Sequence, residues 1–131
     1  MKLNSIILVV FITPFLMVQD DELKISAIRG EDIYKKKCML CHKKNGEGSI
    51  GLFPPLAKSD FLINNRNESI MAIKYGQTGK IKVNGTEYNG IMPASNLNDQ
   101  EIADVINYIM TNWGNESTKM VTVGEVKQLE K

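Results

Sequence analysis

The stretch Cys38-Met39-Leu40-Cys41-His42 contains both cysteines and the only histidine of a chain of 131 residues. C-x-x-C-H is the attachment signature of a c-type haem. Two thiols at this spacing can each add to one vinyl group of a porphyrin. The histidine that follows is then placed under the iron, where an imidazole nitrogen can bind it. The motif therefore predicts one haem c held covalently by Cys38 and Cys41, with His42 as an iron ligand.

Other chemistries of paired cysteines fit the sequence less well. A structural zinc site needs four ligands, usually two pairs, and the chain has no second Cys or His pair. A thioredoxin-like redox motif lies beside a βαβ pattern, and no such alternation is present. A disulfide between Cys38 and Cys41 would constrain very little chain, because the stabilisation grows with loop length. Haem attachment is the favoured interpretation.

Length and composition indicate one ordinary globular domain. The hydrophobic fraction is 43% and the charged fraction 24%, both typical of soluble proteins. The net charge of +1 gives no indication of a nucleic-acid partner.

The N-terminus carries the features of an export segment. Lys2 precedes an apolar run from Ile6 to Val18, which has the length of a signal-peptide core and is short for a membrane span. No small-x-small cleavage site follows the run. Residues 1–18 are therefore predicted as a signal peptide or a short N-terminal anchor, and both alternatives stay open. Either one predicts an exported protein, in the periplasm or attached to the outer face of the cytoplasmic membrane.

Helix signals dominate the rest of the chain. In the predicted helix over residues 27–37, Ile28, Ile33 and Tyr34 lie roughly on one face. Ser59 can cap a short turn through Asn64. A helix is expected over residues 68–75, capped by Asn67 and stopped by Gly76. Another is expected from Asn98 to near Trp113, beginning with a capping-box-like Asn98 and Glu101. Its core-facing stripe consists of Ile102, Val105, Ile106 and Ile109.

Two segments have a different character. Residues 80–90 alternate apolar and polar side chains around Asn84-Gly85, which predicts a small β-hairpin. Residues 115–131 are polar and lack a full apolar stripe, so a peripheral tail is expected, with one helical turn around residues 125–129.

A haem iron that shuttles electrons needs a second axial ligand. With one histidine present, a methionine thioether is the next candidate, and it raises the reduction potential. Met71 and Met110 fall within predicted helices and are interpreted as core residues. Met92 lies in a predicted loop before Pro93, which confines its backbone to extended conformations. Met92 is therefore the predicted distal ligand.

On these motifs the chain resembles a monohaem class I cytochrome c over about residues 26–113. The resemblance also uses Gly30-x-x-x-Tyr34, Gly46-x-Gly48, Pro54-Pro55-Leu56, the run from Tyr88 to Pro93, and the closing helix ending in Trp113. More narrowly, residues 83–93 are similar to those of small cytochromes associated with cbb-type oxidases and of cytochrome domains fused to copper nitrite reductases.

The resemblance implies an all-α class I cytochrome c fold around one covalent haem c, with a small β-hairpin before the distal ligand. It implies that a proline carbonyl, of Pro54 or alternatively Pro55, accepts the N–H of His42. It implies that the first helix crosses the last near Gly30, against Ile106 or Tyr108. Residues 26–113 would form the cytochrome domain and residues 114–131 a polar C-terminal tail.

The implied function is single-electron transfer between respiratory-chain partners outside the cytoplasm, where haem c is attached in this family. The partners would be redox proteins, and the chain would not be an enzyme in its own right. Two alternatives stay open. One is a membrane-anchored cytochrome subunit of an oxidase or reductase complex, and the other is a haem-based gas sensor.

Overall fold

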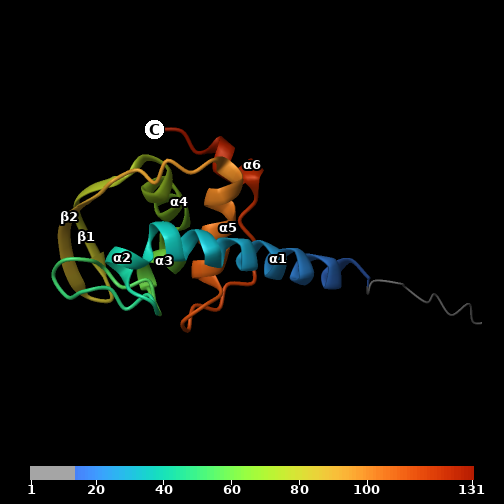
Figure 1. Ribbon diagram of the computed structural model, residues 1–131, viewed down its shortest axis with the longest axis horizontal. Coiled ribbons are helices and arrows are strands. Elements are labelled where there is room, and N and C mark those ends of the chain that lie inside the picture. The colour runs from blue at the N-terminus through green and yellow to red at the C-terminus, as the bar shows by residue number, and fades with distance from the viewer. Residues whose placement is uncertain (1–13) are drawn as a thin grey trace, which may run out of the picture.

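The structure, a computed structural model, describes residues 14–131. Helices form most of this part of the chain, and a two-stranded sheet lies at one end of it (Figure 1). The elements in chain order are α1 (Pro14–Lys37), α2 (Met39–His42), α3 (Asp60–Asn64), α4 (Arg66–Tyr75), β1 (Gln77–Val83), β2 (Thr86–Met92), α5 (Asp99–Met110) and α6 (Val123–Gln128). The predicted fold class, helical with one small hairpin, is confirmed.

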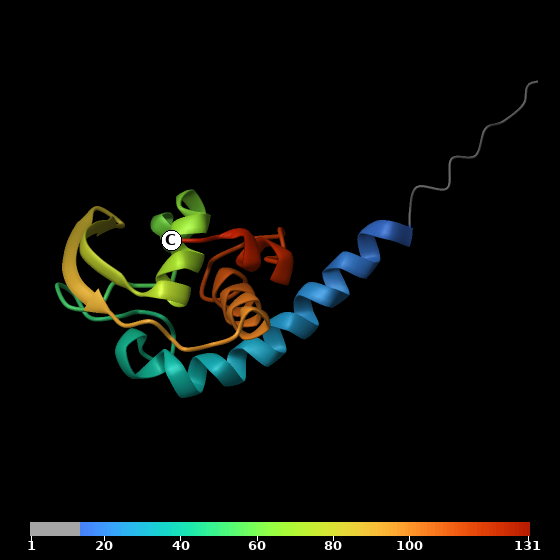
Figure 2. The same cartoon turned by 90° about the horizontal axis from the view of Figure 1, so that it is seen from above.

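Helix α1 is longer than predicted. It begins at Pro14 instead of near Ala27, and its N-terminal half extends beyond the rest of the molecule (Figure 2). Residues 1–13, which make up most of the predicted export segment 1–18, lie outside the described residues. Within residues 14–131, no helix combines the length and the apolar character needed to cross a membrane.

Gly30 allows α1 and α5 to cross at close range. A Cβ atom at Gly30 would lie 2.0 Å from the carbonyl oxygen of Asp104 and 2.9 Å from Cβ of Tyr108. The predicted crossing near Gly30 is confirmed, and Tyr108 rather than Ile106 is the neighbour there.

The rings of Tyr34, Tyr108 and Trp113 pack against one another beside the crossing of α1 and α5. The ring centroids of Tyr34 and Trp113 are 4.8 Å apart, and those of Tyr108 and Trp113 are 5.3 Å apart in an edge-to-face arrangement. Such pairs add about 1 kcal/mol each beyond the area they bury. The two helices are thus joined both by backbone contact and by a compact aromatic cluster.

The buried face of α1 differs from the predicted one. Ile28, expected inward, is 69% exposed, whereas Ser26 is fully buried. The reason is Asp104 on α5, whose buried carboxylate accepts hydrogen bonds from Ser26 Oγ at 2.6 Å and from the Arg29 guanidinium at 2.6 and 2.7 Å. Burying a carboxylate is costly unless it is hydrogen-bonded, so its partners must face α5. Ile28 then points to the opposite side.

Helix α5 follows its sequence signals closely. Asn98 Oδ1 accepts from Glu101 N at 3.0 Å, and the Glu101 carboxylate accepts from Asn98 N at 2.9 Å, which confirms the capping box. The predicted stripe is buried. The helix ends at Met110 rather than near Trp113, because Thr111, with φ of −113° and ψ of 3°, already departs from helical geometry. Trp113 follows with a left-handed φ of 53°.

Helices α3 and α4 line one side of the core. The Ser59 side chain accepts from Leu62 N at 3.4 Å, as predicted for the cap of α3. The predicted cap Asn67 of α4 is wrong: the helix begins at Arg66, and the Asn65 carbonyl accepts both N–H and Oγ–H of Ser69. Gly76, with φ of 84°, ends α4 as predicted.

The predicted β-hairpin is confirmed, and its strands are longer than expected. Asn84 and Gly85 both have positive φ, as a type I′ turn requires, and Val83 pairs with Thr86. The ladder continues to the pair of Gln77 with Met92. Met92 therefore lies at the end of β2, not in a loop as predicted.

The expectation that residues 115–131 are peripheral is wrong. Val121 and Val126 are fully buried in the main hydrophobic cluster. The Asn107 side chain on α5 holds this segment, donating to Val121 O at 2.9 Å and accepting from Val121 N at 2.7 Å. Two valines five positions apart make no helical stripe, so a periodicity argument does not detect them.

Candidate functional site

The junction of α1 and α2 presents the three residues of the motif together. Cys38 N donates to Tyr34 O at 2.9 Å, and Cys38 O accepts from His42 N at 3.0 Å. The backbone thus stays nearly helical through the motif, which keeps Cys38, Cys41 and His42 within one turn of each other. All three line one pocket.

His42 is buried and held in one orientation. Its Nδ1 atom lies 3.0 Å from the carbonyl oxygen of Pro54. A carbonyl oxygen can only accept, so Nδ1 carries the proton and Nε2 keeps its lone pair. Burial lowers the pKa of His42 below its ordinary value, and the bond to Pro54 opposes part of this shift. The imidazole is therefore in the neutral form that binds metals.

The loop after α2 brings Pro54 to the histidine. Gly48 N donates to His42 O at 3.0 Å, and Leu56 N donates to Gly46 O at 2.7 Å. A Cβ atom at Gly48 would lie 2.4 Å from Phe53 O, so a side chain at this position would push the proline segment away. Pro55, the alternative to Pro54, also lines the pocket.

The two cysteines are free thiols without the features of a redox-active pair. Burial, together with the nearby Cys41, raises the pKa of Cys38 to about 11. Reactive cysteines have lowered pKa values that favour the thiolate, and Cys38 shows the opposite. A thioredoxin-like role is therefore disfavoured by the environment of the motif.

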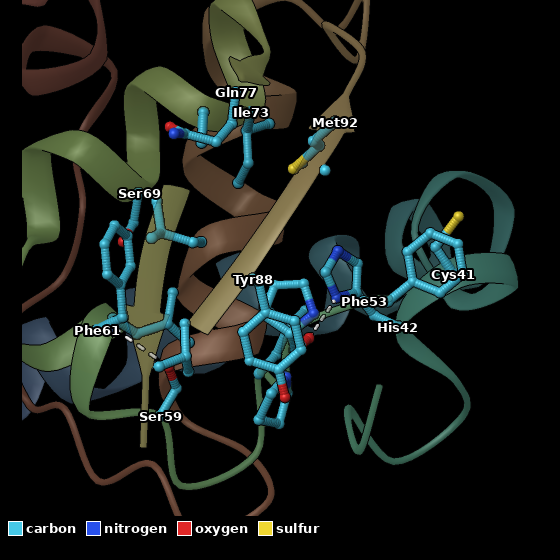
Figure 3. Close-up of a pocket in the computed structure, with 18 of the residues that line it drawn as sticks. Cys41, His42, Phe53, Ser59, Phe61, Ser69, Ile73, Gln77, Tyr88 and Met92 are labelled. Atoms are coloured by element: carbon cyan, nitrogen blue, oxygen red, sulfur yellow. Dashed lines mark hydrogen bonds between the residues drawn. The ribbon is translucent and has the colours of Figure 1, made fainter. Parts of the chain in front are cut away.

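Met92 enters the same pocket from β2. Figure 3 shows His42 on α2 and Met92 on β2, both on the pocket side of their elements. Among the methionines of the described residues, Met92 alone lines the pocket. Met110 is buried in the main core cluster, as its position in a helix predicted, and Met71 is half-buried.

The walls of the pocket are apolar. They come from α3, α4, the hairpin and α5, and include Leu62, Ile73, Val83, Tyr88, Ile106 and Ile109. The space between them that no protein atom fills is about 1080 Å³, including the open mouth. Ser59, Ser69 and Gln77 are the main polar side chains among the lining residues.

The sequence-based reasoning did not identify these wall residues as lining a site. For Ile106 and Ile109 the signal was the stripe of α5, which predicted burial but not a ligand. For Val83 and Tyr88 it was the alternation of the hairpin. Both signals report an inward face, and neither distinguishes a neighbouring side chain from a bound group.

The residues present fit a haem c. Two free thiols, a neutral histidine and a thioether sulfur line one pocket whose other walls are mostly apolar. Among residues 14–131 no three His, Cys, Asp or Glu side chains lie close enough together to hold a metal ion by themselves. Protein-only metal binding of the zinc type is therefore not supported in this part of the chain.

Comparison with known proteins agrees with this chemistry. The sequence profile of the family described as Cytochrome c matches residues 27–113. A cytochrome c-552 of Thermus thermophilus is 40% identical over 116 residues, which cover 82% of this chain and 78% of that protein. The cytochrome c subunit of the quinone alcohol dehydrogenase of Gluconacetobacter polyoxogenes is 31% identical over 118 residues, covering 79% of this chain and 23% of that subunit.

Proposed function

The chain belongs to the cytochrome c family, and we propose that it carries single electrons through one haem c whose iron is bound by His42 and Met92. Members of the family transfer electrons and contain covalently attached haem c, which supplies a one-electron iron couple when bound. The two axial ligands and the redox partners are what we propose for this chain.

One observation carries it. The pocket that holds both cysteines also has a neutral imidazole from α2 and a thioether from β2 on its lining, and its other walls are apolar. Elements far apart in the sequence thus supply an imidazole and a thioether to one space. A six-coordinate iron of this kind leaves no position for a substrate, which supports electron transfer rather than catalysis or gas sensing.

The protein side chains have separate tasks in this scheme. The Pro54 carbonyl fixes the ring of His42 and increases its basicity through the bond to Nδ1. The Met92 thioether is a weak donor that favours ferrous iron and raises the potential. The apolar walls exclude water, which also disfavours the more charged ferric state.

The surface around the pocket mouth supports docking of a redox protein. Leu52 and Ile91, which line the pocket, are 68% and 80% exposed. Leu40 and Ile50, close to Cys41 and Leu52 in the sequence, are 90% and 91% exposed. Neighbouring lysines contribute less free charge than their number indicates, because Lys35 pairs with Glu31 and Lys36 with Asp32. Exposed apolar side chains near a binding pocket are typical of a transient protein contact.

We propose respiratory-chain proteins outside the cytoplasm as the donor and acceptor. Export is supported by the apolar segment in residues 1–18 and by the requirements of haem c attachment in the family.

Substitution of Met92 tests the ligand assignment. In the haem-loaded protein, Met92→Ala is expected to abolish the far-red sulfur-to-iron absorption band and to let carbon monoxide bind the reduced form. Met92→His should keep a low-spin spectrum and lower the potential. Met71→Leu is the matched control, because Met71 does not line the pocket and a volume-conserving change costs little.

Two results would contradict the proposal. If Met92→Ala retains the far-red band, a different residue binds the iron. If the unmodified reduced protein binds carbon monoxide at neutral pH, the sixth position is open and a gas sensor is favoured instead.

A second candidate function, a membrane-anchored cytochrome subunit of a redox complex, is favoured by α1. Residues 14–18 of the predicted export segment are already part of this helix, which continues unbroken to Lys37. Cleavage near residue 18 would therefore cut inside a helix. Some relatives are cytochrome c subunits of quinone alcohol dehydrogenases.

Mass spectrometry of the exported protein separates the two candidates. Retention of residues 1–18 together with recovery in salt-washed membranes supports the anchored subunit. A variant in which a leader with a defined cleavage site replaces residues 1–18 is the control and should be released. Release of the native chain in the same fraction as this control supports the free carrier.

A further inference from the structure

The ammonium group of Lys74, near the end of α4, is surrounded by acceptors from two distant segments. Lys74 Nζ lies 2.9 Å from Val126 O, 3.3 Å from Leu129 O and 3.4 Å from Asp99 Oδ1. The side chain is only 18% exposed. Two backbone carbonyls accept hydrogen bonds from this ammonium group and the Asp99 carboxylate pairs with its charge, so Lys74 links three segments of the protein.

The same end of α4 has a second bond to the C-terminal segment, residues 115–131. Tyr75 Oη donates to Leu129 O at 3.1 Å. The chain end lies beside α4 in both views of the molecule (Figures 1 and 2). The C-terminal segment is therefore attached to the last turn of α4.

That last turn is in direct contact with the segment that contains Met92. Ser95 N donates to Ile73 O at 3.0 Å, and a Cβ atom at Gly76 would lie 2.8 Å from Met92 O. The next residue, Gln77, is the ladder partner of Met92. Ile73, Gln77 and Met92 lie along one edge of the pocket in Figure 3. A displacement of the end of α4 would therefore move the backbone of Met92.

We propose that Lys74 is a positioning residue for the distal iron ligand. It joins the C-terminal segment and the start of α5 to the end of α4, and so restrains both ends of the connection from Met92 to Asp99. The proposal rests on the proposed function, in which Met92 binds the iron. It gives the C-terminal segment a role in the strength of the iron–sulfur bond as well as in the stability of the fold.

The other end of α4 provides a matched control. Arg66 binds the same C-terminal segment through two hydrogen bonds to the Glu125 carboxylate, at 2.6 and 2.9 Å. Arg66 is the first residue of α4, a full helix length away from Gly76. Glu125→Gln therefore weakens the attachment of the segment without removing a group at the Met92 end.

The test measures how readily imidazole displaces the sulfur from the oxidised haem protein. Sulfur and imidazole compete for one position, so weaker restraint of Met92 increases the apparent affinity for imidazole. We expect Lys74→Met to bind imidazole about tenfold more tightly than the unmodified protein, and Glu125→Gln to differ by less than about twofold. Lys74→Arg, which keeps the charge and the donors, should restore most of the difference. Thermal unfolding of each variant is measured in parallel.

The outcomes are distinct. Tighter imidazole binding by Lys74→Met alone, with rescue by arginine, supports the proposal. If Lys74→Met and Glu125→Gln both change the imidazole affinity in proportion to the thermal stability they lose, Lys74 is only a general stabilising residue and the proposal is overturned. If Lys74→Met does not fold, Tyr75→Phe replaces it; an imidazole affinity about two- to threefold tighter is then expected, and an unchanged affinity overturns the proposal.

Failure of the proposed function gives a different pattern. If Met92→Ala retains the far-red band, the ligand assignment itself is wrong. If Met92→Ala loses the band while Lys74→Met leaves the imidazole affinity unchanged, only the role of Lys74 is wrong.

Discussion

Replacing Gly30 by alanine tests the close contact on which the fold depends. The added Cβ atom would lie 2.0 Å from the carbonyl oxygen of Asp104, whereas real contacts of this kind essentially never fall below 3.0 Å. The obstructing atom belongs to the backbone of α5, so no side-chain rotation can relieve the overlap. The two helices must separate locally by about 1 Å.

Two opposing effects determine the size of the change. Overpacking that moves backbone costs about 3 kcal/mol. Alanine in place of a helical glycine gains about 1 kcal/mol. The free energy of unfolding should therefore fall by about 2 kcal/mol, and Tm by about 8 °C for a domain of this size.

Guanidinium unfolding of the haem protein, followed by far-ultraviolet circular dichroism, measures this change as a shift in midpoint. Gly124→Ala in α6 is the matched control, because the nearest atom to its added Cβ would be 3.8 Å away. This control should stabilise the protein by about 0.5–1 kcal/mol. If Gly30→Ala stabilises the protein as the control does, α1 and α5 are not in backbone contact and the reasoning is refuted.

Three further predictions concern other parts of the structure. The hydrogen bonds from Arg66 lower the pKa of Glu125, so this pair stabilises the fold above the ordinary glutamate pKa and stops doing so as the pH falls through the lowered value. In acid unfolding, Glu125→Gln should therefore lose less stability over that pH range than the unmodified protein. An identical pH profile for the two proteins would contradict the pairing. Val126→Ala should lower the free energy of unfolding by about 2 kcal/mol in denaturant, because the side chain is fully buried. A change near zero would show that the C-terminal segment is not packed in the core. Leu52→Asp on the pocket lining should slow electron transfer with a redox partner in stopped-flow measurements at high salt. Ile63→Asp, at a similarly exposed residue outside the pocket lining, should not slow it. Equal rates for the two variants would contradict docking at the apolar surface.

Several local features could be predicted because their causes are local. The turn at Asn84-Gly85 depends on two residues that accept positive φ. The cap at Asn98 depends on a side chain that reaches an N–H three residues away. The attachment motif likewise keeps its chemistry within five residues. Each of these signals is complete within one or two turns of chain.

The errors have a common origin in contacts between distant residues. Asn67 and Asn65 are equally suitable caps by residue type, so the sequence does not decide between them. The helix begins at Arg66, whose side chain binds Glu125 far along the chain. Ile28 is apolar yet exposed, because the carboxylate of Asp104 requires Ser26 and Arg29 to face α5 instead.

The sequence by itself therefore determined the covalent chemistry, the helical class, the hairpin turn and the caps at Ser59 and Asn98, since each depends on neighbours along the chain. Only the tertiary structure decided which face of α1 is buried, how the C-terminal segment packs, and that the carbonyl of Pro54 rather than Pro55 lies beside His42. The buried face of α1 follows from burying the Asp104 carboxylate with its donors, and the C-terminal segment is held by the bonds between Asn107 and Val121. Both involve atoms that are far apart in sequence but close in space, so a pattern within one or two turns of chain does not reveal them.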